Sequence, residues 1–190
     1  SSCSNFYGVR INPSNTGNVR INSKFTLAEG LVLTVDPSFQ YVLANGGGSS
    51  TIAENSVIAK GANSTGPGVD YNGDGDYLDT IRFYTPNTTN TRRWGVTASL
   101  NWSITPEHLV RLAYTFDRGR HRQTGEWGWL DANGNPENVF GGRNGTPVKA
   151  ADGALLRQRD RLSIALLNQI GAQYIGKYFD EALRVEAGVR

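Results

Sequence analysis

The feature that most constrains the fold of this chain is a two-residue alternation of apolar and polar side chains, sustained over six segments. This period places successive side chains on opposite faces of a β-strand. We therefore predict strands at about residues 19–27, 31–43, 93–104, 109–117, 160–178 and 182–190. Strands of ordinary soluble domains span about 3–10 residues, so several of these segments are unusually long. Tight turns at residues 28–30, 105–108 and 180–181 join them in pairs.

One face of each predicted strand is mostly apolar, with exceptions in residues 160–178, where Asn168 falls on the apolar face and Leu167 and Ile175 fall on the polar face. In residues 93–104 the even positions are apolar, whereas the odd positions are polar or small. Aromatic rings near strand ends fit the belts found where a bilayer meets water, and the candidates are Phe39, Tyr41, Trp94, Trp102, Tyr114, Phe116 and Tyr178. Pro37 has no backbone N–H, so we expect an irregularity in its strand.

Two long segments, residues 45–92 and 118–159, are rich in Gly, Asn, Asp, Ser and Thr. Short turns alternating with long loops are typical of transmembrane β-barrels, in which about 9–11 tilted residues cross the hydrocarbon layer. We therefore predict an all-β fold, an antiparallel up-and-down transmembrane β-barrel segment of about six long strands. Its short turns would be periplasmic and its two long loops extracellular. The alternative is a water-soluble antiparallel sandwich, which shows the same alternation.

Composition excludes several other classes of protein. No apolar run is long enough for a membrane-spanning helix, and a net charge of +2 does not favour a nucleic-acid partner. His108 and His121 lack the spacing of zinc ligands, and Cys3 has no second cysteine in the chain to pair with. The sequence has no nucleophile elbow, HExxH motif or phosphate loop, so we do not expect an enzyme.

The chain resembles the barrel of the TonB-dependent receptors, the active transporters of the Gram-negative outer membrane. The stretches that carry the resemblance are Val19–Leu43, Arg93–Asp117 and Leu155–Arg190, together with the loop segment VDYNGDGDYLDTIRFYTPNTTNTRRW at 69–94. The resemblance implies a 22-stranded barrel around an N-terminal plug, with ligand bound at the outer face. It also implies active uptake of a scarce nutrient (siderophore, vitamin, oligosaccharide or peptide). The implied partners are outer-membrane lipid, lipopolysaccharide and, through the plug, the TonB complex.

Six strands do not close a membrane barrel, which needs about eight or more. We therefore expect a mid-to-late portion of a longer barrel, with the plug and the remaining strands outside residues 1–190. Three other functions stay open. They are a passive outer-membrane porin, a calcium-stabilised extracellular β-protein with a structural or adhesive role, and a fragment that assembles into a fibre through its open strand edges.

The sharpest local motif is the acidic run DYNGDGDYLD at residues 70–79. Its first residues follow an EF-hand-like calcium loop, in which oxygen ligands alternate around a glycine turn. The twelfth position holds Ile81 instead of Glu, so the last two carboxylates would have to complete the ligand shell. The sequence therefore predicts a candidate Ca²⁺ site formed by Asp70, Asn72, Asp74, Asp76 and Asp79. The alternative is a plain run of Asx turns in a solvated loop.

Two other sets of loop residues are candidates for ligand contact. Guanidinium groups bind carboxylates and phosphates in a bidentate manner, and arginines flank the second loop at Arg118, Arg120, Arg122, Arg157 and Arg159. They would hold an anionic ligand or lipopolysaccharide phosphates; the alternative is a solvated rim paired with Asp117 and Asp160. Trp127 and Trp129 would stack on a sugar or another flat ligand, and the alternative is packing within a folded loop.

Overall fold

The computed structural model describes residues 6–190, and Cys3 lies outside the described residues. The chain is mostly antiparallel β-sheet, so the predicted all-β class is confirmed. Its helices are η1 (Tyr7–Val9) and α1 (Val57–Lys60). Its strands are β1 (Ser14–Arg20), β2 (Lys24–Ala28), β3 (Leu31–Gly46), β4 (Ser49–Ala53), β5 (Thr80–Tyr84), β6 (Asn87–Thr105), β7 (His108–Glu126), β8 (Arg157–Tyr178) and β9 (Leu183–Val189). In the described part of the chain, no helix is long and apolar enough to cross a membrane.

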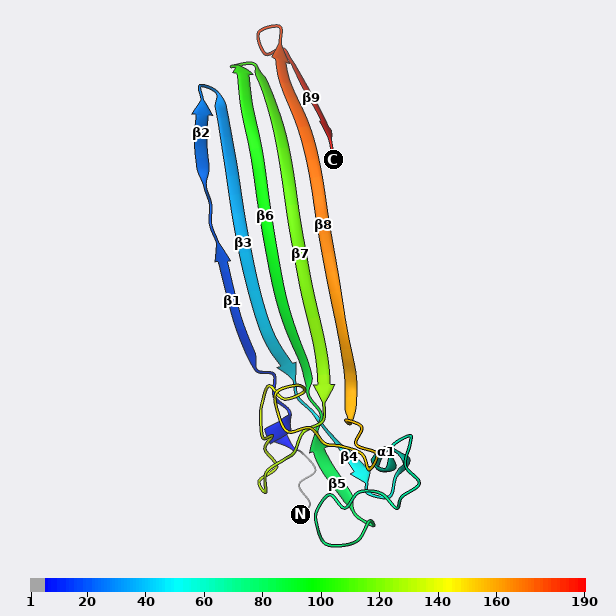
Figure 1. The fold of residues 1–190 in the computed structure, drawn as a ribbon. Coiled ribbons are helices and arrows are strands. Elements are labelled where there is room, and N and C mark those ends of the chain that lie inside the picture. Colours follow the sequence, from blue (N-terminus) through cyan, green and yellow to red (C-terminus); the bar gives the residue numbers. More distant parts are fainter. Residues whose placement is uncertain (1–5) are drawn as a thin grey trace. The chain divides into compact units, whose positions relative to one another are not determined.

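Seven strands form one sheet in the order β1-β3-β6-β7-β8-β9, with β2 also paired to β3, and β4 pairs separately with β5 (Figure 1). Two compact units can be distinguished. The sheet unit comprises Gly17–Tyr41, Thr91–Arg120 and Ser163–Arg190. The loop unit comprises the described part of Ser1–Thr16, together with Val42–Asn90 and His121–Leu162. Strands β1, β3, β6, β7 and β8 contribute residues to both units.

Four strands are longer than their hydrophobic alternation indicates. Strands β3, β6, β7 and β8 continue through residues 44–46, 87–92, 118–126 and 157–159. These extensions carry polar or small residues on both faces, so no apolar period marks them in the sequence. Residues 45–92, expected to be a loop, contain β4, α1 and β5. These elements have only four or five residues each, which is too short for a periodic signal.

A strand break lies opposite Pro37. The predicted strand 19–27 is instead two strands, β1 and β2. Ile21 donates its N–H to the Pro37 carbonyl at 3.0 Å, but Pro37 has no N–H to donate in return. Two residues further on, the Ser23 N–H donates to the Asp36 side-chain carboxylate at 3.1 Å, not to a backbone carbonyl. The irregularity expected at Pro37 is therefore present, and it appears on the partner strand.

The two units differ in where their apolar side chains lie. Every hydrophobic side chain that is buried within residues 6–190 belongs to the loop unit, namely Val9, Ile52, Ala59, Phe83, Tyr84, Val148, Ala150 and Leu156. Within the sheet unit, only Ser99 and Gly176 are buried. Many of its large apolar side chains are exposed, including Phe25, Leu27, Trp102, Leu112, Ile164, Leu166 and Ile170. The sheet unit therefore contains no apolar core of its own.

Candidate functional site

The site with the most defined chemistry lies at one end of the β4–β5 ladder in the loop unit. The last ladder pair joins Ala53 to Thr80, so Glu54 and Asp79 occupy the next cross-strand position. Glu54 N–H donates to the Asp79 carbonyl at 3.0 Å, which continues the antiparallel register. Two acidic side chains directly opposite each other repel, and this destabilises a strand pair unless another charge compensates.

Three carboxylates meet here. Glu54, Asp76 and Asp79 each offer one oxygen, and these atoms lie within 4.8 Å of one another. Glu54 is 0% exposed, and its Oε1 accepts the Tyr71 N–H at 2.6 Å. Its Oε2 is buried and has no hydrogen-bond partner within residues 6–190. An unpaired buried carboxylate oxygen is costly, and a cluster of carboxylate oxygens is a donor set that can bind a metal ion.

The Asp70 carboxylate holds the first half of the acidic run in a turn. Its Oδ1 accepts the Gly73 N–H at 2.6 Å, and its Oδ2 accepts the Gly75 N–H at 2.9 Å. Gly73 and Gly75 have φ values of 77° and 96°, in the left-handed region that favours glycine. Further along, the Asn72 side chain accepts the Asp74 N–H at 3.2 Å. The Asx turns weighed against a cation site are therefore present in the first half of the run.

Asn72 links two further carboxylates of the run. Its Nδ2 donates to Asp79 Oδ2 at 2.8 Å and to Asp74 Oδ2 at 3.1 Å. The Asn72 hydrogen bond lowers the pKa of Asp79, but the contact with Asp74 and the negative charges of Asp74 and Asp76 outweigh it, so the pKa of Asp79 is raised. The pKa of Asp74 is lowered, chiefly because its carboxylate accepts the Asp76 N–H. Repulsion between the carboxylates of the run thus raises the pKa of Asp79, which is the cross-strand neighbour of Glu54.

The structure assembles a different set of carboxylates from the one that the motif suggests. Of the five predicted cation ligands, Asp76 and Asp79 belong to the cluster, and Glu54 joins them. Sequence reasoning missed Glu54 because no motif spacing connects it to residues 70–79. The connection comes from the β4–β5 register, and that register could have been found only by recognising two five-residue strands in a loop.

The predicted arginines divide between the two units. In the loop unit, Arg122 and Arg157 both form ion pairs with Asp160, the latter at 2.7 Å. Arg159 belongs to the same unit, and its Nε is buried with no hydrogen-bond partner in the part of the chain that is described. Arg118 and Arg120 lie in β7 of the sheet unit. Asp160 therefore pairs with two of the guanidinium groups, and its single negative charge offsets one of their two positive charges.

Trp127 and Trp129 pack inside the loop unit. The Trp129 ring lies edge-to-face with Phe83 at 5.3 Å and with Tyr71 at 6.2 Å, measured between ring centroids. The Trp127 ring is 6.5 Å from that of Phe83. Both indoles are partly buried against the cluster that contains Phe83, Ile52 and Val148. This arrangement gives both side chains a packing role.

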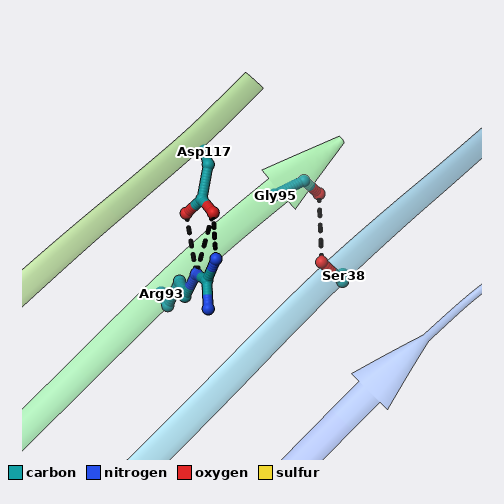
Figure 2. Close-up of polar contacts among 4 residues, drawn as sticks. All are labelled: Ser38, Arg93, Gly95 and Asp117. Carbon is teal, nitrogen blue, oxygen red and sulfur yellow. Dashed lines mark hydrogen bonds and ion pairs between the residues drawn. The ribbon is translucent and has the colours of Figure 1, made fainter. Parts of the chain in front are cut away.

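The sheet unit carries a polar row on one face. Arg93 Nε lies 2.8 Å and 2.9 Å from the two carboxylate oxygens of Asp117, and Nη2 contacts one of them (Figure 2). Close by, Ser38 Oγ donates to the Gly95 carbonyl at 3.5 Å. A Cβ at position 95 would lie 2.8 Å from Ser38 Oγ, so glycine gives this close approach its room. These residues belong to the face that the alternation predicts to be polar.

The apolar row of the sheet unit extends over several strands and is largely exposed. The rings of Phe39 and Trp94 are in contact, with centroids 5.4 Å apart, so strands β3 and β6 present these side chains on one face. Asn168 interrupts the apolar row of β8, and the Tyr114 hydroxyl donates to its Oδ1 at 2.9 Å. The polar atom in this row is therefore satisfied by a neighbouring strand.

Comparisons with known proteins returned no matching family model, no matching curated protein and no matching solved structure. The resemblance to the TonB-dependent receptors consequently stays a prediction. The functional argument depends on the chemistry of the two units.

Proposed function

We propose that this chain forms part of the wall of an outer-membrane β-barrel of the TonB-dependent receptor type, which takes up a scarce nutrient actively. The observation that carries the proposal is the exposed apolar row of the sheet unit. Ile164, Leu166 and Ile170 lie at every-second-residue positions of the long strand β8 and are 56%, 62% and 73% exposed. Burying such surface away from water stabilises a protein by about 25 cal/mol per Å².

A bilayer supplies the apolar environment that the sheet unit lacks internally. Lipid would cover the row containing Phe39, Trp94 and Leu166, while the face with Arg93 and Asp117 would line a hydrated interior. The edge strands of the sheet, β1 with β2 on one side and β9 on the other, have free edges for further strands. The proposal therefore accounts for both faces and both edges.

The receptor type is proposed over a passive porin for two reasons. The chain resembles the receptor barrel in three strand pairs and one loop. The loop unit also has its own buried core, and a preordered outer surface suits the capture of a dilute ligand. The role is transport and not catalysis. Its partners would be lipid, lipopolysaccharide at the loop arginines, and the TonB complex through a plug outside these residues.

The test is alternate-residue labelling in the native polypeptide within outer membranes. With Cys3 replaced by Ser, single cysteines are placed at Ser163, Ile164, Ala165 and Leu166. The proposal expects a water-soluble maleimide to label positions 163 and 165, and brominated lipid to quench a fluorophore at positions 164 and 166. Equal labelling of all four positions would overturn the lipid-facing assignment.

A second candidate function is a calcium-stabilised extracellular β-protein, and the carboxylate cluster of Glu54, Asp76 and Asp79 favours it. In that case protein, including further copies of the chain at its open edges, would cover the apolar row. The intact mass of the native polypeptide separates the two candidates. A species much heavier than 20.7 kDa confined to detergent extracts supports the barrel, and a chain of about that mass in the aqueous fraction supports the extracellular protein.

A further inference from the structure

We propose that Glu54, Asp76 and Asp79 bind one calcium ion, which fastens the segment 54–79 onto the β4–β5 ladder. The inference concerns the loop unit alone. It holds whether or not the sheet unit crosses a membrane, so its test and the labelling test of the barrel can fail independently.

The first argument is the state of Glu54. The side chain is fully buried, Oε1 is held by the Tyr71 N–H, and Oε2 has no hydrogen-bond partner within residues 6–190. None of the ion pairs formed by the described residues involves Glu54, Asp76 or Asp79. Three carboxylates thus meet around a buried oxygen without a compensating cation from the protein.

The second argument is distance. Calcium binds oxygen at about 2.3–2.6 Å, so two oxygens on the same ion are at most about 5 Å apart. The three carboxylate oxygens meet this limit, since they lie within 4.8 Å of one another. Each of the three carboxylates brings one oxygen to the cluster, and calcium, which takes about six to eight oxygen ligands in a flexible geometry, can complete its shell with water. Magnesium binds at about 2.0–2.1 Å and usually keeps several waters, so this donor set favours calcium.

The third argument is what the ion would connect. The Glu54 carbonyl accepts the Val69 N–H at 3.1 Å, and its side chain accepts the Tyr71 N–H. Gly68 has φ 140°, and a Cβ there would lie 1.9 Å from the Glu54 carbonyl oxygen, so the chain passes very close to the ladder end. Asp76 is exposed and comes from the far side of the Asp70 turn. An ion shared by Asp76 and Glu54 would close the acidic run against the ladder.

The test is a titration of the metal-stripped full chain with Tb³⁺ and then Ca²⁺. Tyr71 is held against Glu54, so it would sensitise Tb³⁺ emission, and Ca²⁺ should quench the emission by displacement. Glu54→Gln and Asp79→Asn should each weaken Ca²⁺ binding by about tenfold or more, since even outer-shell changes at metal sites cost about 10–100-fold. The matched control is Asp131→Asn, because Asp131 is an exposed carboxylate of the same unit that accepts the Asn133 and Asn135 N–H groups. Its binding should be unchanged.

A stability measurement separates ligation from a structural role of Glu54. Without calcium, Glu54→Gln should be at least as stable as the wild type, because it removes a buried charge that faces Asp79. With calcium, only the wild type and Asp131→Asn should gain in Tm and resist proteolysis between residues 54 and 79. No saturable binding to the wild type at millimolar Ca²⁺, or equal binding by Glu54→Gln and the wild type, would overturn the proposal.

Discussion

The loop unit and the sheet unit are stabilised in opposite ways. In the loop unit Phe83 is 0% exposed and packs against Tyr71 and Trp129, as side chains do in an ordinary globular core. In the sheet unit Leu166 is 62% exposed. The same chain therefore contains one part that buries its own apolar surface and another whose stability depends on what surrounds it.

Polar groups show the same difference. Asn45 is 1% exposed in the loop unit, where it donates to the Val139 carbonyl at 2.5 Å and accepts the Asn87 N–H at 2.9 Å. In the sheet unit the Arg93 side chain is 56% exposed even though it is paired with Asp117. Buried polar contacts define a unique packing, whereas exposed cross-strand pairs add little to stability. The effect of a substitution on stability should therefore depend on side-chain burial in the loop unit, and on the surrounding medium and the salt concentration in the sheet unit.

The largest expected effect is that of Phe83→Ala. Removing a fully buried aromatic side chain typically destabilises a core by about 3–5 kcal/mol. We expect this loss in the free energy of local opening of β4 and β5, measured by hydrogen exchange, with β8 and β9 unaffected. The control is Val57→Ala, at a side chain that is 81% exposed in the same unit, and it should change stability by less than about 0.5 kcal/mol. Equal losses of opening free energy from Phe83→Ala and Val57→Ala would mean that the loop unit has no stabilising core of its own.

Leu166→Arg should have the next largest effect, and only in a bilayer. An arginine on the lipid face near the bilayer midplane costs about 2–4 kcal/mol, whereas an exposed surface substitution in water changes stability by about 0.5 kcal/mol or less. Unfolding in lipid vesicles measures the difference. Ser163→Arg, on the polar face of the same strand, serves as the control. A Leu166→Arg variant as stable as Ser163→Arg would place both faces in water.

A smaller effect is expected from the Arg93–Asp117 pair. Both side chains are accessible to solvent, so Asp117→Asn should cost less than about 1 kcal/mol, and the cost should shrink as salt is added. A double-mutant cycle with Arg93→Gln isolates the pair. A coupling energy above about 2 kcal/mol, insensitive to salt, would mean that this face is shielded from water.

The smallest predicted effects depend on pH and have opposite signs within the loop unit. The pKa of Asp131 is lowered by hydrogen bonds from Asn135, so its contribution to stability is present above the ordinary Asp value of about 3.9 and is lost as the pH falls through its own lower value. The pKa of Asp79 is raised, so its contribution is present below that value and is lost as the pH rises. In calcium-free protein, acid should therefore relieve the repulsion at Asp79 and loosen the turn 131–135.

Carboxyl carbon NMR titration and hydrogen exchange would measure these shifts. Asp79→Asn should abolish the first pH effect, and Asp131→Asn should abolish the second. Titration of Asp79 below Asp131 would contradict the crowding of carboxylates at the ladder end.

Much of the fold could be predicted because its signal is periodic. The alternation around Trp94 and Leu166 identifies strands from side-chain chemistry alone, and the strand extensions fail to show it because both of their faces are polar. Pro37 indicates from the sequence where the ladder is interrupted, but not that the break appears in the neighbouring strand. The missing N–H belongs to β3, whereas the visible break lies in its partner.

The candidate site could be predicted only in part. Asp76 and Asp79 carry a local motif, but Glu54 reaches them through the register of β4 and β5. Register depends on which residues pair across the ladder, and a short ladder with few apolar residues leaves little trace of it in the sequence. Packing of Trp127 and Trp129 within a folded loop is one of the two outcomes that the sequence allows, but their partner Phe83 comes from another strand and no motif indicates it.

The break opposite Pro37 also affects the order in which the first hairpin can assemble. Zipping can start at the turn of residues 29–30 and pair β2 with β3, a contact between neighbours in the sequence. This pairing stops at Pro37, because proline has no N–H to donate to the neighbouring strand. Strand β1 must therefore begin its own pairing with β3 beyond the interruption. Strand β1 can therefore separate from β3 as far as Pro37 while β2 stays paired with β3. This gives the first strand a built-in stopping point for both assembly and unzipping.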